Sequence, residues 1–300
     1  MKRLLAVFAV AAGIAAMNGC REQPKEPSPT FGPLQMVAAS SVGALVDTLS
    51  GEFARIYPAI VPRVRTASAR EAVVALLNDS VRTICIDRRL NAEEQRIADS
   101  VGMTIAETRI AWDALAVVVN AAHRLDSITI GTIADIVSGA AGRWSQVRGS
   151  SRNDAIVFVT TERNSGLYEE IQQRFVGADR PLKVAAAGET QSSCLEYVSR
   201  TPGALTIVSL QALVHRPGHV RVVPVAVAAD SAAESPSQLA VYTRKYPLRT
   251  ELMVYNAERR LGPGSGFAAF ILTTQGQKLV QESGLVPEVL PYRVIQITSE

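Results

Sequence analysis

The chain has 300 residues, of which 47% are hydrophobic and 20% charged, with 31 Lys+Arg against 28 Asp+Glu and only three Cys. These values are those of an ordinary globular protein, and they exclude a disordered chain, a collagen-like repeat and a disulfide-rich mini-protein. A net charge of +3 and an aromatic content of 5% also argue against a nucleic-acid partner, which needs a basic surface or stacking aromatics.

The first nineteen residues are typical of an export signal. Positive charge at Lys2 and Arg3 precedes an apolar run over 4–16, which is too short to cross a bilayer of about 30 Å comfortably. The run ends in Gly19-Cys20, which resembles a bacterial lipoprotein cleavage site. We therefore predict a signal peptide over 1–19 and lipidation of Cys20. An ordinary secretory signal followed by a chance cysteine is the alternative.

The segment 20–33 is rich in proline and polar residues and cannot form a core of its own. We predict that it is an extended tether, so that the membrane is contacted through the lipid anchor only and the folded body begins at Leu34. Without residues 1–19 the net charge falls to +1, because Lys2 and Arg3 are removed with no acidic residue. The overall charge therefore says little about a ligand.

From residue 34 onward, short apolar runs alternate with segments of helical periodicity. The first half is predicted to contain strands at 34–39, 60–65, 83–86, 104–110 and 114–120 and helices at 42–56, 71–78 and 92–98. The second half is predicted to contain helices at 128–137, 166–175, 192–199 and 267–283 and strands at 155–160, 204–208 and 252–255. This alternation indicates an α/β fold with mainly parallel sheets.

Motifs for catalysis, metals and nucleotides are weak in this sequence. Residues 262–266 are Gly-rich but do not have the strand–GxGxxG–helix pattern of a dinucleotide site, so we predict a flexible loop there. His215 and His219 are predicted to lie in a solvated turn rather than to bind a metal. No Ser or Cys stands beside a recognisable base, so we predict no enzyme, metal or cofactor. Cys85 and Cys194 are predicted to be small buried residues without a disulfide.

Several short motifs share an order and spacing that identify a family. They are ASSVGAL at 39–45, DRRL at 87–90, DALAVVVN at 113–120, WSQV at 144–147, ERNSG at 162–166, PGAL at 202–205, YPL at 246–248 and FILTTQGQ at 270–277. Together they resemble the phosphate-binding proteins of bacterial ABC importers, within the type II periplasmic binding-protein fold. The resemblance covers roughly residues 34–287.

The resemblance implies a two-lobed α/β fold in which each lobe is a mainly parallel sheet flanked by helices. Lobe one would comprise 34–112 plus 245–300, and lobe two would comprise 113–244. Two crossing segments would join the lobes, and the ligand would bind in the cleft and draw them together.

The resemblance also implies a set of ligand-binding residues at helix starts, where free N–H groups and the positive end of the helix dipole favour anions. Hydroxyls add donors there, and glycine lets the backbone approach closely. For each serine, a plain helix cap is the alternative role. The expected ligand-binding residues are Ser40, Ser41, Val42, Ser68, Asp87, Arg163, Ser165 and Gly166.

Asp87 is an unusual residue type for an anion site, because a carboxylate repels an anion unless it accepts a proton from it. Phosphate near neutral pH keeps a proton and sulfate does not, so Asp87 would select phosphate. The alternative is a surface aspartate that pairs with Arg88 or Arg89.

Three positions depart from the family pattern in the ligand loops. Thr161 stands where the family has a cleft arginine, and Leu167 replaces a threonine. The loop around Ser68 has no glycine, and Arg70 is a candidate for the missing positive charge. A bidentate arginine contributes strongly to phosphate recognition, so these changes leave the ligand open.

Our first functional hypothesis is an exported, lipid-anchored, monomeric protein that captures inorganic phosphate for an ABC permease, in the periplasm or at the cell surface. The second is a related binding or sensor module for another ligand or a protein partner. The third, a phosphatase or hydrolase, finds no metal set and no nucleophile–base pair among the motifs.

Overall fold

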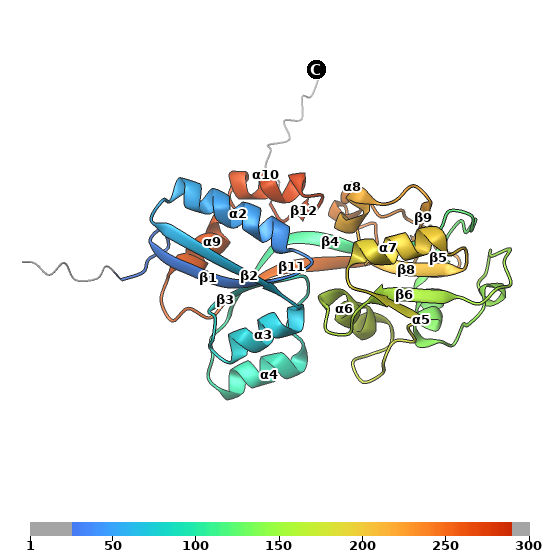
Figure 1. Cartoon of the computed structure of the whole chain (residues 1–300), viewed down its shortest axis with the longest axis horizontal. Helices are drawn as coiled ribbons and strands as arrows, with labels where there is room; N and C mark the ends of the chain where they lie inside the picture. Colours follow the sequence, from blue (N-terminus) through green and yellow to red (C-terminus); the bar gives the residue numbers. More distant parts are fainter. Residues whose placement is uncertain (1–25, 290–300) are drawn as a thin grey trace, which may run out of the picture.

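The computed structural model describes residues 26–289, which form two lobes side by side that strands connect (Figure 1). The strands are β1 Gly32–Ala39, β2 Ile60–Ala67, β3 Thr83–Ile86, β4 Ala106–Asn120, β5 Ile128–Thr129, β6 Val157–Thr161, β7 Ala186–Gly188, β8 Ala204–Ser209, β9 Val220–Val223, β10 Val225–Ala226, β11 Arg249–Asn256 and β12 Val286–Pro287. The helices are α2 Gly43–Ile56, α3 Ala69–Leu77, α4 Ala92–Ser100, α5 Ile130–Ser138, α6 Gly166–Phe175, α7 Gln191–Arg200, α8 Gln238–Tyr242, α9 Pro263–Ile271 and α10 Thr274–Glu282, with short 3₁₀ turns η1 Trp144–Gln146 and η2 Gln211–His215.

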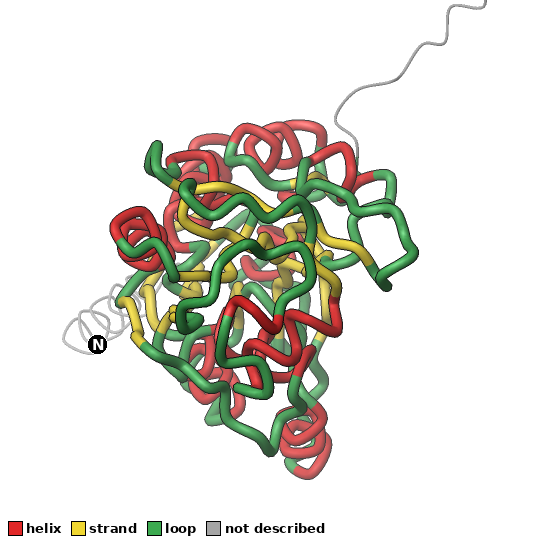
Figure 2. Tube along the Cα trace, turned by 90° about the vertical axis from the view of Figure 1, so that its right-hand side faces the viewer, coloured by secondary structure: helices red, strands yellow, loops and turns green. Residues whose placement is uncertain are grey.

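Ten of the strands form one sheet that passes through both lobes in the order β2-β1-β3-β11-β4-β8-β6-β7, with β9 and β12 paired to β4, and β5 and β10 form a separate two-stranded sheet. Strands β1, β2 and β3 run parallel in one lobe, and β6, β7 and β8 run parallel in the other. The predicted parallel pairing holds for these two sets, but β4 and β11 run antiparallel to their neighbours because they cross between the lobes. Figure 2 shows helices around the outside of the strands.

Each lobe is built around its own hydrophobic core. One core gathers buried residues from 34–111 and from 252–285, and the other gathers residues from 114–248 together with Val286. Helix α2 illustrates why these segments fold as they do, since its apolar positions Leu45, Val46, Leu49 and Phe53 are all buried on one face. The lobe boundaries given above remain a prediction.

The crossover strand β4 is longer than the sequence predicts. Two strands were expected on either side of Trp112-Asp113, but β4 runs without interruption from Ala106 to Asn120. Its first part pairs with β11 and its second part with β8 and β9, so the same strand serves both lobes. A shift in the β4–β11 pairing, between Leu252 and Met253, bends the strands before they leave the first lobe.

Two predictions near the C-terminus are wrong. The single helix expected over 267–283 is two helices, α9 and α10, because the Thr273 hydroxyl caps a new helix by accepting from the Gly276 N–H. The Gly-rich segment 262–266 is not a flexible loop but the start of α9. There the carboxylate of Glu258 accepts hydrogen bonds from three backbone N–H groups and one hydroxyl.

The N-terminal predictions fall largely outside the described residues. The signal peptide at 1–19 and the lipidation of Cys20 lie there, as does the tether up to residue 25. Residues 26–33, the end of the predicted tether, contain a bridge between Ser28 and Phe31, and β1 already begins at Gly32 rather than at Leu34. No helix within 26–289 is long and apolar enough to cross a membrane.

Candidate functional site

A cleft of about 800 Å³ lies between the two lobes, and four helices begin at its walls. Helices α2 and α3 start there from one lobe and α6 and α7 from the other. The first residues of a helix have N–H groups without intrahelical partners, and the helix dipole is positive at that end. The cleft therefore has the properties of an anion site. Residues at the four starts that line it include Ser40, Ser41, Ala44, Ser68, Ala69, Ser165, Gly166, Thr190 and Gln191.

The start of α2 is uncapped by any side chain of the described chain. The alternative role of Ser40 and Ser41, capping this helix, is not what the structure contains, because Val42 occupies the capping position. The Ser40 hydroxyl donates instead to the carbonyl of Ala67 (2.9 Å), and the Ser41 hydroxyl donates to Asp87 (2.7 Å). The first N–H groups of α2 are consequently left for a ligand.

Ser68 and Ser165 both cap helices, which is the alternative role that we gave for these serines. The Ser68 hydroxyl accepts from the Glu71 N–H, and the Ser68 N–H donates to the Glu71 carboxylate, which completes a capping box on α3. The Ser165 hydroxyl accepts from the Tyr168 N–H at the start of α6, and it lies 2.6 Å from the Thr161 hydroxyl. Both serines still line the cleft, so capping and ligand contact are compatible.

Asp87 follows β3 and projects into the cleft from lobe one. Its Oδ2 accepts from Ser41, whereas Oδ1 is buried and has no hydrogen-bond partner within residues 26–289. Burial raises the pKa of Asp87, although the Ser41 hydrogen bond opposes the shift. Arg88 and Arg89 pair with other carboxylates. The alternative interpretation, in which Asp87 is a surface residue paired with one of them, is therefore wrong.

The unpartnered oxygen of Asp87 lies against Gly166, the first residue of α6 in the opposite lobe. A Cβ at position 166 would overlap Asp87 Oδ1. Beside this contact is a smaller cavity of about 30 Å³, which is enough for about two water molecules. Ser41, Val42 and Asp113 are among its lining residues. Ser41 and Asp87 line both the cleft and this smaller cavity, so the two adjoin where a buried carboxylate oxygen meets a helix N-terminus.

Within the described chain, the side chains that line the large cleft include five carboxylic acids and no lysine or arginine. Arg163, predicted to bind ligand, is exposed and does not line the cleft, and neither does Arg70. Thr161, at the family's arginine position, uses its hydroxyl on Ser165. Leu167 is 6% exposed and packs into the core of lobe two, so it supplies its backbone N–H but no hydroxyl. Anion binding here would rest on N–H groups and hydroxyls.

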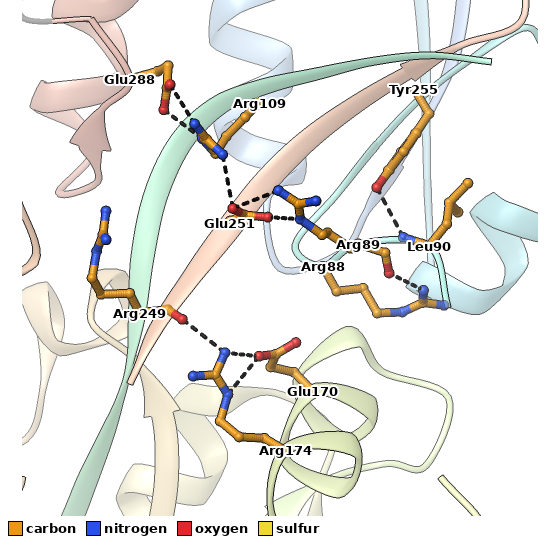
Figure 3. Close-up of polar contacts among 10 residues, drawn as sticks. All are labelled: Arg88, Arg89, Leu90, Arg109, Glu170, Arg174, Arg249, Glu251, Tyr255 and Glu288. Carbon is orange, nitrogen blue, oxygen red and sulfur yellow. Dashed lines mark hydrogen bonds and ion pairs between the residues drawn. The ribbon is translucent and has the colours of Figure 1, made fainter. Parts of the chain in front are cut away.

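Arg89 and Arg109, near the crossover strands, form ion pairs (Figure 3). Arg89 pairs with Glu251. Arg109 pairs both with Glu251, at 3.0 Å, and with Glu288, at 2.8 Å. The guanidinium of Arg109 also lies over the Trp112 ring, 4.2 Å from its centroid. These pairs tie the crossover strands to lobe one rather than presenting free charge to the cleft.

Sequence reasoning missed the contributions of α7 and of the crossover. Thr190 caps α7 with a capping box, so the N-terminus of this helix opens onto the cleft beside Gln191 and Ser192. A threonine just before a helical segment was the available signal. Asp113 was seen only as part of a motif, yet its Oδ1 accepts from the N–H groups of Ala114 and Gln211 beside the small cavity.

Residues 26–289 contain no group of three or more His, Cys, Asp or Glu placed to hold a metal ion. Cys85 and Cys194 are both buried free thiols, as predicted. His215 and His219 are exposed, and His215 lies at the cleft edge.

Comparisons with known proteins agree with this geometry. A family model described as "PBP superfamily domain" matches residues 23–274. The protein SphX of Synechococcus elongatus is 24% identical over 256 residues, covering 83% of this chain and 75% of SphX. The phosphate-binding protein PstS of Staphylococcus saprophyticus is 20% identical over 252 residues, covering 83% and 78%.

Solved structures with the same fold include a phosphate transport receptor and a protein named PstS. An ABC-type phosphate transport receptor from Vibrio cholerae superposes with a TM-score of 0.71 at 19% identity, covering 85% of this chain and all of that one (100%). PstS from Borrelia burgdorferi superposes with a TM-score of 0.60 at 17% identity, covering 85% and 98%. The two-lobed α/β architecture is therefore the fold of these binding proteins.

Proposed function

Because the chain belongs to the PBP superfamily, we propose that it captures inorganic phosphate in the inter-lobe cleft and delivers it to an ABC permease. The PstS of Staphylococcus saprophyticus, a relative over 83% of the chain, is named as a phosphate-binding protein. In this role the protein binds and releases its ligand without chemical change. Lobe one would comprise 34–112 plus 245–300, and lobe two 113–244.

One observation carries the choice of ligand: the buried, unpartnered Oδ1 of Asp87 at the start of α6. Around it, helix N-termini supply donors for an oxyanion. A hydrogen phosphate ion has both oxygens that accept from such donors and a proton that Asp87 can accept. Sulfate at neutral pH has no such proton, and a buried acceptor left unpaired costs about 1–3 kcal/mol. The proposed site residues are Ser40, Ser41, Val42, Ser68, Asp87, Ser165 and Gly166.

Titration calorimetry tests this function. The protein is first stripped of endogenous ligand by partial unfolding and dialysis, and then titrated with phosphate and with sulfate at neutral pH. We expect saturable binding of phosphate at one site and none of sulfate. A folded protein that gives no heat with phosphate would refute the proposed ligand.

A second candidate function is a binding or sensor module for a different ligand. It is favoured by one observation, the lack of any lysine or arginine among the described residues that line the cleft. The same calorimetry, extended to other oxyanions and to neutral solutes, separates the two candidates. Binding of another solute in place of phosphate would favour the second.

We further propose export of the protein and attachment to a bacterial membrane through lipid on Cys20, as a monomer. The support is the N-terminal sequence alone. Metabolic labelling with palmitate should mark the wild-type protein and leave Cys20→Ser unlabelled. Equal labelling of both would refute the anchor, and light scattering of the detergent-free protein would test the monomer.

A further inference from the structure

Arg88 is a buried arginine that contacts both lobes. It follows Asp87 in lobe one, and its side chain is 3% exposed. Two of its nitrogens lie 2.8 Å from the two carboxylate oxygens of Glu94, at the start of α4 in the same lobe. Its Nε lies 2.6 Å from Oε2 of Glu169, which belongs to α6 in the other lobe, and the two groups form an ion pair without the alignment of a hydrogen bond. One guanidinium therefore joins lobe one to lobe two.

The partner helix is the one that presents Ser165 and Gly166 to the cleft. Glu169 lies in the first turn of α6, three residues after Gly166, so the ion pair acts close to the ligand-facing end. The last turn of α6 is also attached to the crossover, because Arg174 donates to the carbonyl of Arg249 at 2.9 Å (Figure 3). Both ends of α6 are thus held against elements outside its own lobe.

We propose that Arg88 and Glu169 form an inter-lobe clasp that positions the start of α6 against Asp87 and populates the closed conformation before ligand binds. The inference rests on the proposed function for the identity of the ligand, but the clasp itself needs no ligand. Glu94 keeps Arg88 in place by binding the opposite side of the guanidinium. Glu169 is 18% exposed, so the pair is only weakly screened by salt.

The clasp would act on affinity through the population of the closed state. Apparent affinity falls in proportion to the fraction of protein that is already competent to bind. A lost clasp that lowers this fraction tenfold would weaken phosphate binding about tenfold. The family's cleft arginine is replaced by Thr161, so positioning of α6 becomes more important for the remaining donors.

The test is Glu169→Gln, which removes the charge and keeps the size of the side chain. Small-angle X-ray scattering of the ligand-free protein should give a larger radius of gyration than wild type, and calorimetry should give about tenfold weaker phosphate binding. The matched control is Glu196→Gln on α7, whose carboxylate pairs with Arg200 four residues along the same helix. This control should match wild type in both measurements.

Arg88→Lys serves as the second variant, because lysine keeps the charge but cannot bind Glu94 and Glu169 at once through a planar fork. It should also expand the ligand-free protein. If both variants fold and keep the wild-type radius of gyration, the clasp is refuted, whatever their affinity. If wild type binds no phosphate, the proposed function fails, and the scattering experiment still decides about the clasp.

Discussion

Asp87 and Gly166 touch across the two lobes, because the unpartnered Oδ1 of Asp87 occupies the space that a side chain at residue 166 would need. Asp87 follows β3 of lobe one, and Gly166 is the first residue of α6 in lobe two. A negative oxygen at a helix N-terminus is favoured by the helix dipole. Close approach of the lobes at the end of the cleft therefore depends on a residue without a Cβ.

Gly166→Ala should weaken phosphate binding at least tenfold. The added methyl group must push Asp87 away from α6, which prevents the lobes from closing around a ligand. Thermal unfolding should change little, because the contact lies between the lobes and not inside either core. Calorimetry with phosphate, combined with a thermal unfolding curve, measures both effects.

Gly51→Ala is the matched control for this substitution. Gly51 lies on α2, where a Cβ would meet no atom within 4 Å, so alanine should stabilise the helix by about 1 kcal/mol and leave affinity unchanged. Unaltered phosphate affinity in Gly166→Ala would show that the Asp87–Gly166 contact plays no part in binding.

Asp87→Asn should allow sulfate to bind. The amide of asparagine can donate to an oxygen of a fully deprotonated anion, whereas the carboxylate repels it. Calorimetry with sulfate should detect binding to the variant at neutral pH and none to wild type. Asp47→Asn, on the exposed face of α2, should keep the wild-type selectivity. Selectivity that is identical in wild type and Asp87→Asn would remove Asp87 from its assigned role.

The sequence was informative wherever a local pattern determines structure. Strand β3 begins and ends at the predicted residues, and α4 begins at the predicted residue 92, directly after its cap Asn91, because apolar runs and capping residues act within a few positions. The break between α9 and α10 was missed, since the apolar positions 267–283 continue the helical period through Thr273. The cap at Thr273 starts a new helix, although the apolar pattern alone predicts one continuous helix.

The candidate site could be predicted only in part, because it depends on contacts between distant segments. The order of motifs brought Ser40, Ser41, Asp87 and Gly166 to one cleft. Nothing local in the sequence separates Arg88, which reaches Glu169, from Arg89, which pairs with Glu251. Which neighbour of a charged side chain lies in the other lobe is a property of the fold.

Asp113→Asn should change how stability depends on pH. Burial raises the pKa of Asp113 to about 6, well above its ordinary value of 3.8, although N–H donors from Ala114 and Gln211 oppose the shift. The folded protein therefore binds this proton more tightly than the unfolded chain does. Wild type should lose about 2–3 kcal/mol of stability relative to the variant as the pH rises from about 4 through about 6, and the difference should level off by about pH 7.

Urea unfolding of both proteins at several pH values measures this difference. Asparagine can still accept from the two backbone N–H groups, so the variant should fold normally. Asp126→Asn, at a fully exposed position, should follow the wild-type curve. Parallel curves for wild type and Asp113→Asn would contradict a raised pKa at this position.

Glu258→Gln should destabilise the protein at neutral pH by about 1–2 kcal/mol, because one carboxylate caps the start of α9. Burial opposes ionisation of Glu258, but hydrogen bonds from Asn256, Gly264 and Ser265 outweigh it and lower its pKa below the ordinary value of 4.5. A lowered pKa means that the stabilisation is present above pH 4.5 and is lost as the pH falls through the folded-state value. The difference in unfolding free energy between wild type and Glu258→Gln should therefore disappear in acid.

Urea unfolding at pH 7 and at pH 3 measures this difference. Glu93→Gln, at an exposed position of α4, is the control and should differ from wild type by no more than about 0.5 kcal/mol. A gap of the same size at both pH values would mean that the charge of Glu258 does not stabilise the start of α9.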